Sequence, residues 1–455
     1  MIGKIIERIA GAPARALDAT VDKSRSVRDT VAQYKLVRKA HEYWHILGPG
    51  LTTGASDDDP SGIATYSQTG AHHGFQLLWL AGFTFPLMAV VQEMCARIGI
   101  VTGQGLAANI RENYPRWVLV LCTTLLFFAN GFNIGADLGA MAKGTQLLFP
   151  NIAYGLLVVG FTALSLGLQI FSSYAKYSRY LKYLALILLC YVFAALSAGL
   201  NWREVAVHAV LPSVTFSKKE IILICAVLGT TISPYLFFWQ TAQEVEEEIL
   251  MGRDTIELRK GATDQEVRHM RLDVWSGMLL SNVVMFFIIA ACAATLYTNG
   301  ITDIATAADA AKALRPFAGD QAYLLFALGI IGTGLLAVPV LAGSASYAIS
   351  ESFGWDHGLH RQLKEASAFY GVIIISMVGG LLMNFVNIDP FKALIYSAVG
   401  NGLVAPIILV LIVLISKNKN VMGNRANRPF TTFVGWAITC IMAFAGAATI
   451  VSLFS

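Results

Sequence analysis

Three successive aspartates, Asp57, Asp58 and Asp59, stand directly before Pro60 in an otherwise apolar stretch of the chain. Gly62 follows two residues later, so carboxylates are combined here with the two residue types that interrupt a helix. A carboxylate at membrane depth costs about 2.5–3.5 kcal/mol on insertion scales, and a helix break is tolerated there where it lines a cavity or a site. The segment therefore predicts a binding site.

A second interruption occurs further along the chain, where Thr230 and Ser233 precede Pro234. Carboxylate, hydroxyl and freed backbone carbonyl groups at the two interruptions are hard oxygen donors, which suit Mg²⁺ and Mn²⁺. Neither interruption contains histidine or cysteine, which disfavours copper or zinc. A lone proline would be only a kink, and Asp57 and Asp58 would also fit a helix end at a membrane interface.

The composition indicates a polytopic membrane protein, because 56% of the 455 residues are hydrophobic and only 14% are charged. No phosphate-binding loop or nucleophile constellation is present, so we expect neither an enzyme nor a cofactor. The cysteines all fall in apolar segments, without metal-ligand spacing, and we expect them to pack as small hydrophobic residues: Cys95, Cys122, Cys190, Cys225, Cys292 and Cys440.

Apolar runs long enough to cross a bilayer recur along the whole chain. They predict an all-α membrane protein with about eleven spans, at roughly 45–70, 76–101, 117–142, 152–172, 180–200, 220–243, 274–297, 322–347, 368–388, 393–416 and 430–453. Both interruptions lie in the first span of a five-span set. Corresponding interrupted helices in two halves are typical of inverted-repeat transporters. We expect one repeat at residues 45–200, a second at 220–416 and an additional helix at 430–453.

Lys and Arg are concentrated in alternate loops, which places the N-terminus in the cytoplasm and the C-terminus outside. The basic N-terminal segment, residues 1–44, is expected to lie on anionic lipid rather than on nucleic acid. The partners expected are a divalent metal ion and the lipid bilayer, and no obligate protein partner is evident.

The segment "GPGLTTGASDDDPSGIAT", Gly48 to Thr65, resembles the first span of the Nramp divalent-metal transporters, whose pattern there is Asp-Pro-Gly-Asn. The similarity continues through residues 77–106 and into the sixth span. It implies the fold of sodium-coupled amino-acid symporters, a LeuT-like 5+5 inverted repeat with helices 1 and 6 unwound at the site.

The resemblance also implies a set of metal-binding positions: Asp59, Gly62, Thr230 and Ser233. Asp59 matches the family's aspartate, and Thr230 falls where a backbone carbonyl binds the metal. Gly62 replaces the metal-binding asparagine and Ser233 the metal-binding methionine. An all-oxygen, roomier site suits partly hydrated Mg²⁺. The pattern is most similar to the Nramp-related magnesium transporters, which implies Mg²⁺ import, with Mn²⁺ as a second substrate, across a prokaryotic cytoplasmic membrane.

The family's proton relay looks neutral in this chain. Asn133 and Ala136 stand where acids are expected in the third span, with Asp137 one place off, and Tyr235 replaces a histidine. The ninth span has no arginine. Uncoupled transport is therefore the simpler reading. The alternatives are a proton-coupled Mn²⁺ or Fe²⁺ symporter, an amino-acid or organic-cation symporter on the same fold, and a metal sensor that does not transport.

Other polar residues have plainer interpretations. Glu93 and Arg97 are expected to pair within one helix. Asn401 would either line the path or lie where two glycines pack. Glu244, Glu246, Glu247 and Glu248 are expected to form a solvated face, with a cation exit funnel as the alternative, and His72 and His73 to lie at the surface.

Overall fold

The structure is a computed structural model that describes residues 47–171, 189–304, 306–386 and 388–454. The predicted N-terminal segment and the beginning of the predicted fifth span lie outside these residues. The described residues contain helices and no strand. The longer helices are α4 (Pro49–Asp57), α5 (Pro60–His73), α6 (Trp79–Thr102), α7 (Leu106–Asn113), α8 (Arg116–Leu148), α9 (Tyr154–Phe171), α11 (Leu189–Ser197), α12 (Trp202–Val210), α13 (Lys218–Thr231), α14 (Pro234–Leu250), α16 (Asp264–Thr295), α19 (Ala322–Phe353), α20 (Ser367–Met383), α21 (Pro390–Lys417) and α23 (Pro429–Phe454).

Short helices connect some of these elements: α15 (Ile256–Arg259), α17 (Ala307–Ala311), α18 (Arg315–Ala318) and α22 (Lys419–Met422). Within the described part, 8 helical segments are long and apolar enough to cross a membrane, with α13 and α14 counted as one. The other predicted spans correspond to the broken pair α4 and α5, to α11, and to α20 with 17 residues. The all-α organisation therefore agrees with the sequence.

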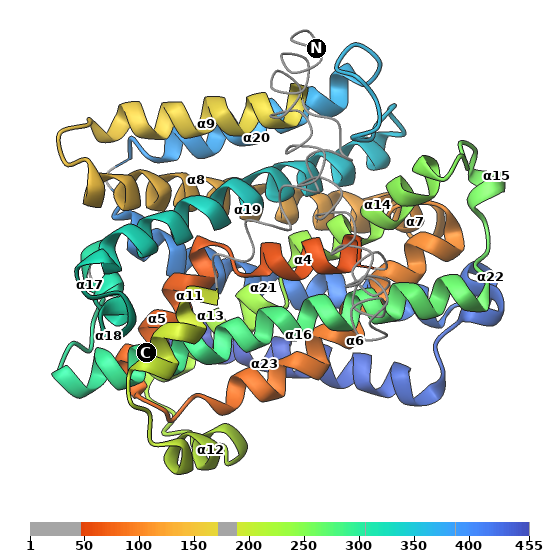
Figure 1. Cartoon of the computed structure of the whole chain (residues 1–455). Helices are drawn as coiled ribbons and strands as arrows, with labels where there is room; N and C mark the ends of the chain where they lie inside the picture. The colour runs from red at the N-terminus through yellow and green to blue at the C-terminus, as the bar shows by residue number, and fades with distance from the viewer. Residues whose placement is uncertain (1–46, 172–188, 305, 387, 455) are drawn as a thin grey trace, which may run out of the picture. The chain divides into compact units, whose positions relative to one another are not determined.

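Four helices lie side by side as one group. α8 packs along α19, α9 and α20, and α19 packs along α20; Figure 1 shows the four together above α4, α6 and α16. The broken helices belong to a second group, in which α16 contacts α4, α5 and α6 while α14 packs on α6. The limits of the two repeats remain a prediction.

α4 is held against α16 by a close backbone approach. A Cβ on Gly54 would lie 2.2 Å from the carbonyl oxygen of Gly277, and a Cβ on Gly277 would lie 2.1 Å from that of Gly50. The Asp273 carboxylate of α16 accepts the backbone N–H groups of Gly50 and Leu51, at 2.6 and 3.1 Å. α16 therefore supplies the N-cap that α4 lacks in its own sequence.

Five arginines lie near the ends of several helices. We call this region the basic end and define it by Arg111, Arg253, Arg259, Arg361 and Arg425. There Arg253 pairs with Glu266, Arg425 pairs with Asp264, and Arg259 donates to the Gly103 carbonyl at 3.1 Å. These contacts connect the C-terminal end of α6 with the N-terminal end of α16. The side of the membrane that this end faces stays a prediction.

Two expectations about surface residues are wrong. Glu244, Glu246 and Glu248 are buried, with 7, 2 and 6% of their surface exposed, because α14 packs against α6 and α19 along most of its length. His73 is also buried, at 9%. A run of acidic residues signals exposure only when no neighbouring element covers it, and the local sequence does not show the neighbours.

Two other expectations are confirmed, one of them in part. Glu93 and Arg97 form the intrahelical pair, at 3.8 Å, and Glu93 also accepts from Arg271 of α16 at 2.8 Å. Five of the six cysteines are buried as expected, whereas the expectation is wrong for Cys440, which is exposed on α23.

The contact between α4 and α16 predicts that Gly54→Ala destabilises the protein, by about 1–3 kcal/mol, because the added methyl group meets backbone that has no room to move aside. The unfolding midpoint of the purified protein in detergent is the measurement. Gly160→Ala is the matched control, since a Cβ there meets nothing within 4 Å. Equal midpoints for the two variants would contradict the close packing.

Candidate cation site at two helix breaks

Asp59 caps the helix that begins after the first break. Residues 58 and 59 separate α4 from α5, and the Asp59 side chain is the N-cap of α5, accepting from the Gly62 N–H and the Ser61 hydroxyl at 2.7 Å each. Its other oxygen accepts from the Asn133 amide of α8 at 3.0 Å. An ionised carboxylate has about four lone-pair sites, so Asp59 keeps the capacity to bind a cation.

The second break separates α13 from α14 at residues 232 and 233. The Ser233 hydroxyl lies 2.7 Å from the carbonyl oxygens of both Gly229 and Thr230, which share its one proton. Ser233 thus satisfies carbonyls at the open end of α13, as water or a ligand would otherwise have to do. A metal ion would share the Thr230 carbonyl with this hydroxyl.

The two breaks face each other. A Cβ on Gly62 would lie 3.1 Å from the Asp57 carbonyl oxygen and 3.2 Å from the Thr230 hydroxyl oxygen. The Tyr235 hydroxyl of α14 also donates to the Ser56 carbonyl of α4, at 2.8 Å. The structure therefore brings Gly62 and Thr230 together beside the Asp59 cap, and the space next to Gly62 is narrower than the sequence suggested.

Four buried carboxylates surround this junction: Asp57, Asp58, Asp59 and Asp137. Ser281 of α16 donates to Asp57 at 2.7 Å and lies 3.3 Å from an oxygen of Asp58. In the part of the chain that the structure describes, no lysine, arginine or histidine forms an ion pair with these aspartates. A bound cation would offset the repulsion among them.

Asp137 is the residue whose role the sequence left open. It is fully buried on α8, neither carboxylate oxygen has a hydrogen-bond partner among the described residues, and it lies near Asp59 and the Ser61 backbone. Its only signal in the sequence was an acid in an apolar span, one position from the expected place. Ser281, which donates to Asp57, carried no such signal.

The described residues contain no group of three or more His, Cys, Asp or Glu side chains arranged as a metal site. A cation at the breaks would therefore be bound by few carboxylate oxygens, with hydroxyl, carbonyl and water oxygens completing its coordination. Such a donor set suits a hard divalent ion that retains water.

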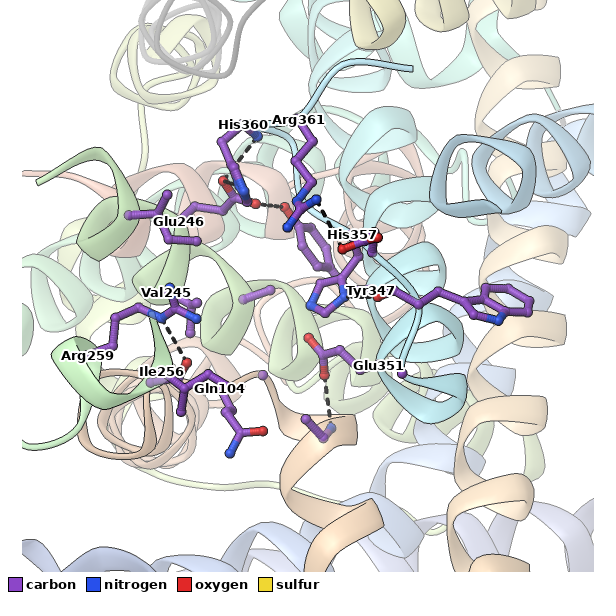
Figure 2. Close-up of a pocket in the computed structure, with 18 of the residues that line it drawn as sticks. Gln104, Val245, Glu246, Ile256, Arg259, Tyr347, Glu351, His357, His360 and Arg361 are labelled. Carbon is purple, nitrogen blue, oxygen red and sulfur yellow. Dashed lines mark hydrogen bonds and ion pairs between the residues drawn. The ribbon is translucent and has the colours of Figure 1, made fainter. Parts of the chain in front are cut away.

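A polar cavity of about 220 Å³ lies elsewhere, at the basic end, between α14, α19 and the loop that follows α19 (Figure 2). Glu246 there accepts from the Tyr347 hydroxyl, from two backbone N–H groups of the loop and from His360, all at 2.6–3.2 Å. Burial lowers the pKa of the Arg259 guanidinium in its wall, and Glu248 opposes that shift. Through these bonds Glu246 connects α14 with α19 and with the loop that follows it.

Comparison with known proteins shows the family of the chain. The family model described as natural resistance-associated macrophage protein-like matches residues 50–452, which include both breaks. The chain belongs to the Nramp family. Membership of this transporter family confirms that the chain is not an enzyme.

Three similar proteins illustrate the relationship. The divalent metal cation transporter MntH of Klebsiella pneumoniae subsp. pneumoniae is 25% identical over 408 residues, which cover 87% of this chain and 91% of that protein. The crystal structure of the Eremococcus coleocola manganese transporter, in complex with an aromatic bis-isothiourea substituted compound, has a TM-score of 0.69 at 20% identity and covers 90% of this chain and 87% of that one. MhsT with L-phenylalanine has a TM-score of 0.57 at 13% identity and covers 89% and 98%. The expected LeuT-like fold is confirmed.

The surroundings of Asp137 predict that Asp137→Asn raises the stability of the metal-free protein by about 1–3 kcal/mol, because a buried unpartnered charge beside Asp59 is removed. The unfolding midpoint in a chelator-containing buffer is the measurement. Asp320→Asn, at an exposed position, serves as the control and should leave the midpoint unchanged. A lower midpoint for Asp137→Asn would show that the fold depends on this carboxylate.

Proposed function

We propose that the chain is a divalent metal transporter that carries Mg²⁺, with Mn²⁺ as a second substrate, through the site between the two helix breaks. The observation that carries the proposal is the meeting of the Asp59 cap with Gly62 and Thr230 in an environment of oxygen donors. The similarity to a divalent metal cation transporter and to a manganese transporter supports divalent metal transport in general.

In this proposal each predicted site residue has a distinct role. Asp59 supplies the charged ligand, and Thr230 supplies its backbone carbonyl oxygen. Gly62 contributes by having no side chain, which lets the Thr230 hydroxyl approach the first break. Ser233 contributes a hydroxyl oxygen where a softer donor would favour manganese or iron over magnesium.

Unpartnered polar atoms around the breaks favour a hydrated ion. Buried polar groups nearly always have a partner, yet partners are missing among the described residues for one Asp57 oxygen, the hydroxyls of Thr65 and Tyr66, and the Asp137 carboxylate. Water molecules bound to the cation would satisfy such groups. Mg²⁺ keeps several of its waters when proteins bind it, whereas a site that strips the ion completely would need more direct ligands.

Transport is proposed to run downhill without protons, into the cytoplasm of a prokaryotic cell whose membrane holds the N-terminus inside and the C-terminus outside. The Asn133 amide and the Tyr235 hydroxyl, at two positions of the family's relay, are neutral and are hydrogen-bonded to Asp59 and to the Ser56 carbonyl. Proton-coupled Mn²⁺ transport is the second candidate, and the buried Asp137 carboxylate is the observation that favours it.

The role of Asp59 predicts that Asp59→Ala abolishes metal uptake, because the substitution removes the carboxylate that caps α5 beside Gly62 and Thr230. Manganese uptake into proteoliposomes and the elution profile of the purified variant are the measurements. Asp320→Ala is the matched control and should transport normally, since Asp320 is exposed. Near-normal uptake by Asp59→Ala would remove this residue from the site.

The donor atoms at the two breaks also predict how the site selects between magnesium and manganese. Ser233→Met with Gly62→Asn adds a soft donor and an amide, so magnesium should lose more affinity than manganese. Thr230→Ala is added because the Thr230 hydroxyl stands 3.2 Å from the new Cβ. A differential of ~1.4 kcal/mol would change the preference tenfold.

The measurement is inhibition of manganese uptake by magnesium, compared between the native protein, the triple variant and Thr230→Ala alone as the control. Millimolar magnesium should inhibit the native protein and the control but inhibit the triple variant less. Equal inhibition of all three would show that these positions do not set the selectivity.

A further inference from the structure

A groove of about 710 Å³ runs along the contact between α8 and α19 at the basic end. Its wall consists mainly of apolar side chains, among them Leu119, Val120 and Phe128 of α8 and Phe353 of α19. Phe128 and Phe353 are 69 and 68% exposed, although both belong to helices long enough to cross the membrane. The groove therefore opens toward the surface that would face lipid.

Two of the three hydroxyl groups in the wall, those of Thr123 and Ser352, are used within their own helices, and the third is that of Thr124. The Thr123 hydroxyl donates to the Leu119 carbonyl at 2.9 Å, and the Ser352 hydroxyl donates to the Ala348 carbonyl at 2.6 Å. Both donors are thus used inside their own helices. What the groove presents along its length is hydrocarbon, which suits an acyl chain better than a peptide or a sugar.

The mouth of the groove is cationic. Arg111 and Arg116 line it, and no acidic residue does; the nearby Glu112 lines a different cavity. Arg116 is exposed and has no ion-pair partner among the described residues, while Arg111 donates to the Glu351 carbonyl. Arg116 is also the first residue of α8, whose N-terminus adds partial positive charge.

Exposed tryptophans lie close to Arg116 and to Phe353 of the groove. Trp117 is 68% exposed beside Arg116, and Trp355 is 39% exposed and stacks on Phe353 at 4.8 Å between ring centroids. Exposed tryptophans are enriched where a membrane helix meets the headgroup layer. From Arg116 to Phe127 the groove follows α8 for roughly 16 Å. That is about half of the ~30 Å hydrocarbon thickness, or one leaflet.

We propose that this groove binds one anionic phospholipid, with its phosphate at Arg111 and Arg116 and an acyl chain against Val120 and Phe128. Cationic charge at headgroup level, an apolar wall below it and a length of one leaflet together match a lipid molecule. A net negative headgroup is specified because Arg116 is exposed, has no ion-pair partner among the described residues and meets no carboxylate in the lining of the groove, whereas Arg111 also lines the adjacent cavity that contains the Glu351 carboxylate.

The test is a titration of the full-length protein in neutral detergent with phosphatidylglycerol, using the unfolding midpoint as the readout of binding. Phosphatidylcholine and free glycerol phosphate form the comparison arms. Arg116→Gln and the double variant with Arg111→Gln remove the headgroup contacts, and Val120→Trp fills the groove. Lys417→Gln with Lys419→Gln removes two charges elsewhere and is the matched control.

Phosphatidylglycerol should raise the native midpoint more than phosphatidylcholine does. Its apparent affinity should fall about fivefold in Arg116→Gln and further in the double variant. Val120→Trp should also weaken it, while the lysine control should not. Equal responses of Arg116→Gln and the native protein, or of the two lipids, would overturn the proposal. An equal effect of glycerol phosphate would replace it with a simple anion site. If the double variant does not fold, the responses of Arg116→Gln and Val120→Trp still test whether the groove binds the lipid.

Discussion

The hydrogen bonds of the Asp59 carboxylate are the interaction on which the site depends. A helix interrupted at membrane depth exposes backbone N–H groups that lipid cannot satisfy. Asp59 satisfies the Gly62 N–H at the start of α5, and it also binds α8 through Asn133. The same oxygens that let the chain resume a helix are therefore the charged oxygens offered to a cation. Removing them would affect α5 and the ion together, which is why stability and uptake have to be measured separately.

The rest of the second helix group keeps the two breaks in contact. α16 holds α4 through the Gly54–Gly277 approach and through Asp273, so the position of the first break follows from a neighbouring helix. α21 holds α13 in a similar manner, since a Cβ on Gly229 would lie 2.1 Å from the Ala398 carbonyl. With both partners fixed, Tyr235 reaches the Ser56 carbonyl across the junction.

The sequence predicted the parts of this arrangement that rest on local chemistry. Proline and glycine within apolar spans mark helix breaks wherever they occur, so Asp59 and Thr230 were placed at the breaks correctly. It also predicted where most of the spans begin to within a few residues, but α8, α14 and α19 extend further than their predicted spans. α16 begins ten residues before its predicted span because the capping box of Thr263 and Glu266 starts the helix outside the apolar run.

What the sequence did not predict depends on packing between distant segments. Glu246 is buried because a loop more than a hundred residues away supplies its hydrogen-bond donors. Ser281 reaches Asp57 from another helix, and no local pattern distinguishes it from other serines. The lack of a side chain at Gly62 predicted free space in the site, yet the Thr230 hydroxyl and the Asp57 carbonyl occupy the space beside it.

Magnesium is proposed to cross the membrane through this chain without protons. The most direct test is magnesium influx into proteoliposomes at a fixed, inside-negative potential, with a magnesium dye and a pH dye trapped in the lumen. We expect protein-dependent magnesium entry that grows with the potential while the internal pH stays constant. No entry above that of protein-free liposomes would contradict the magnesium assignment, and acidification that depends on the metal would contradict uncoupled transport.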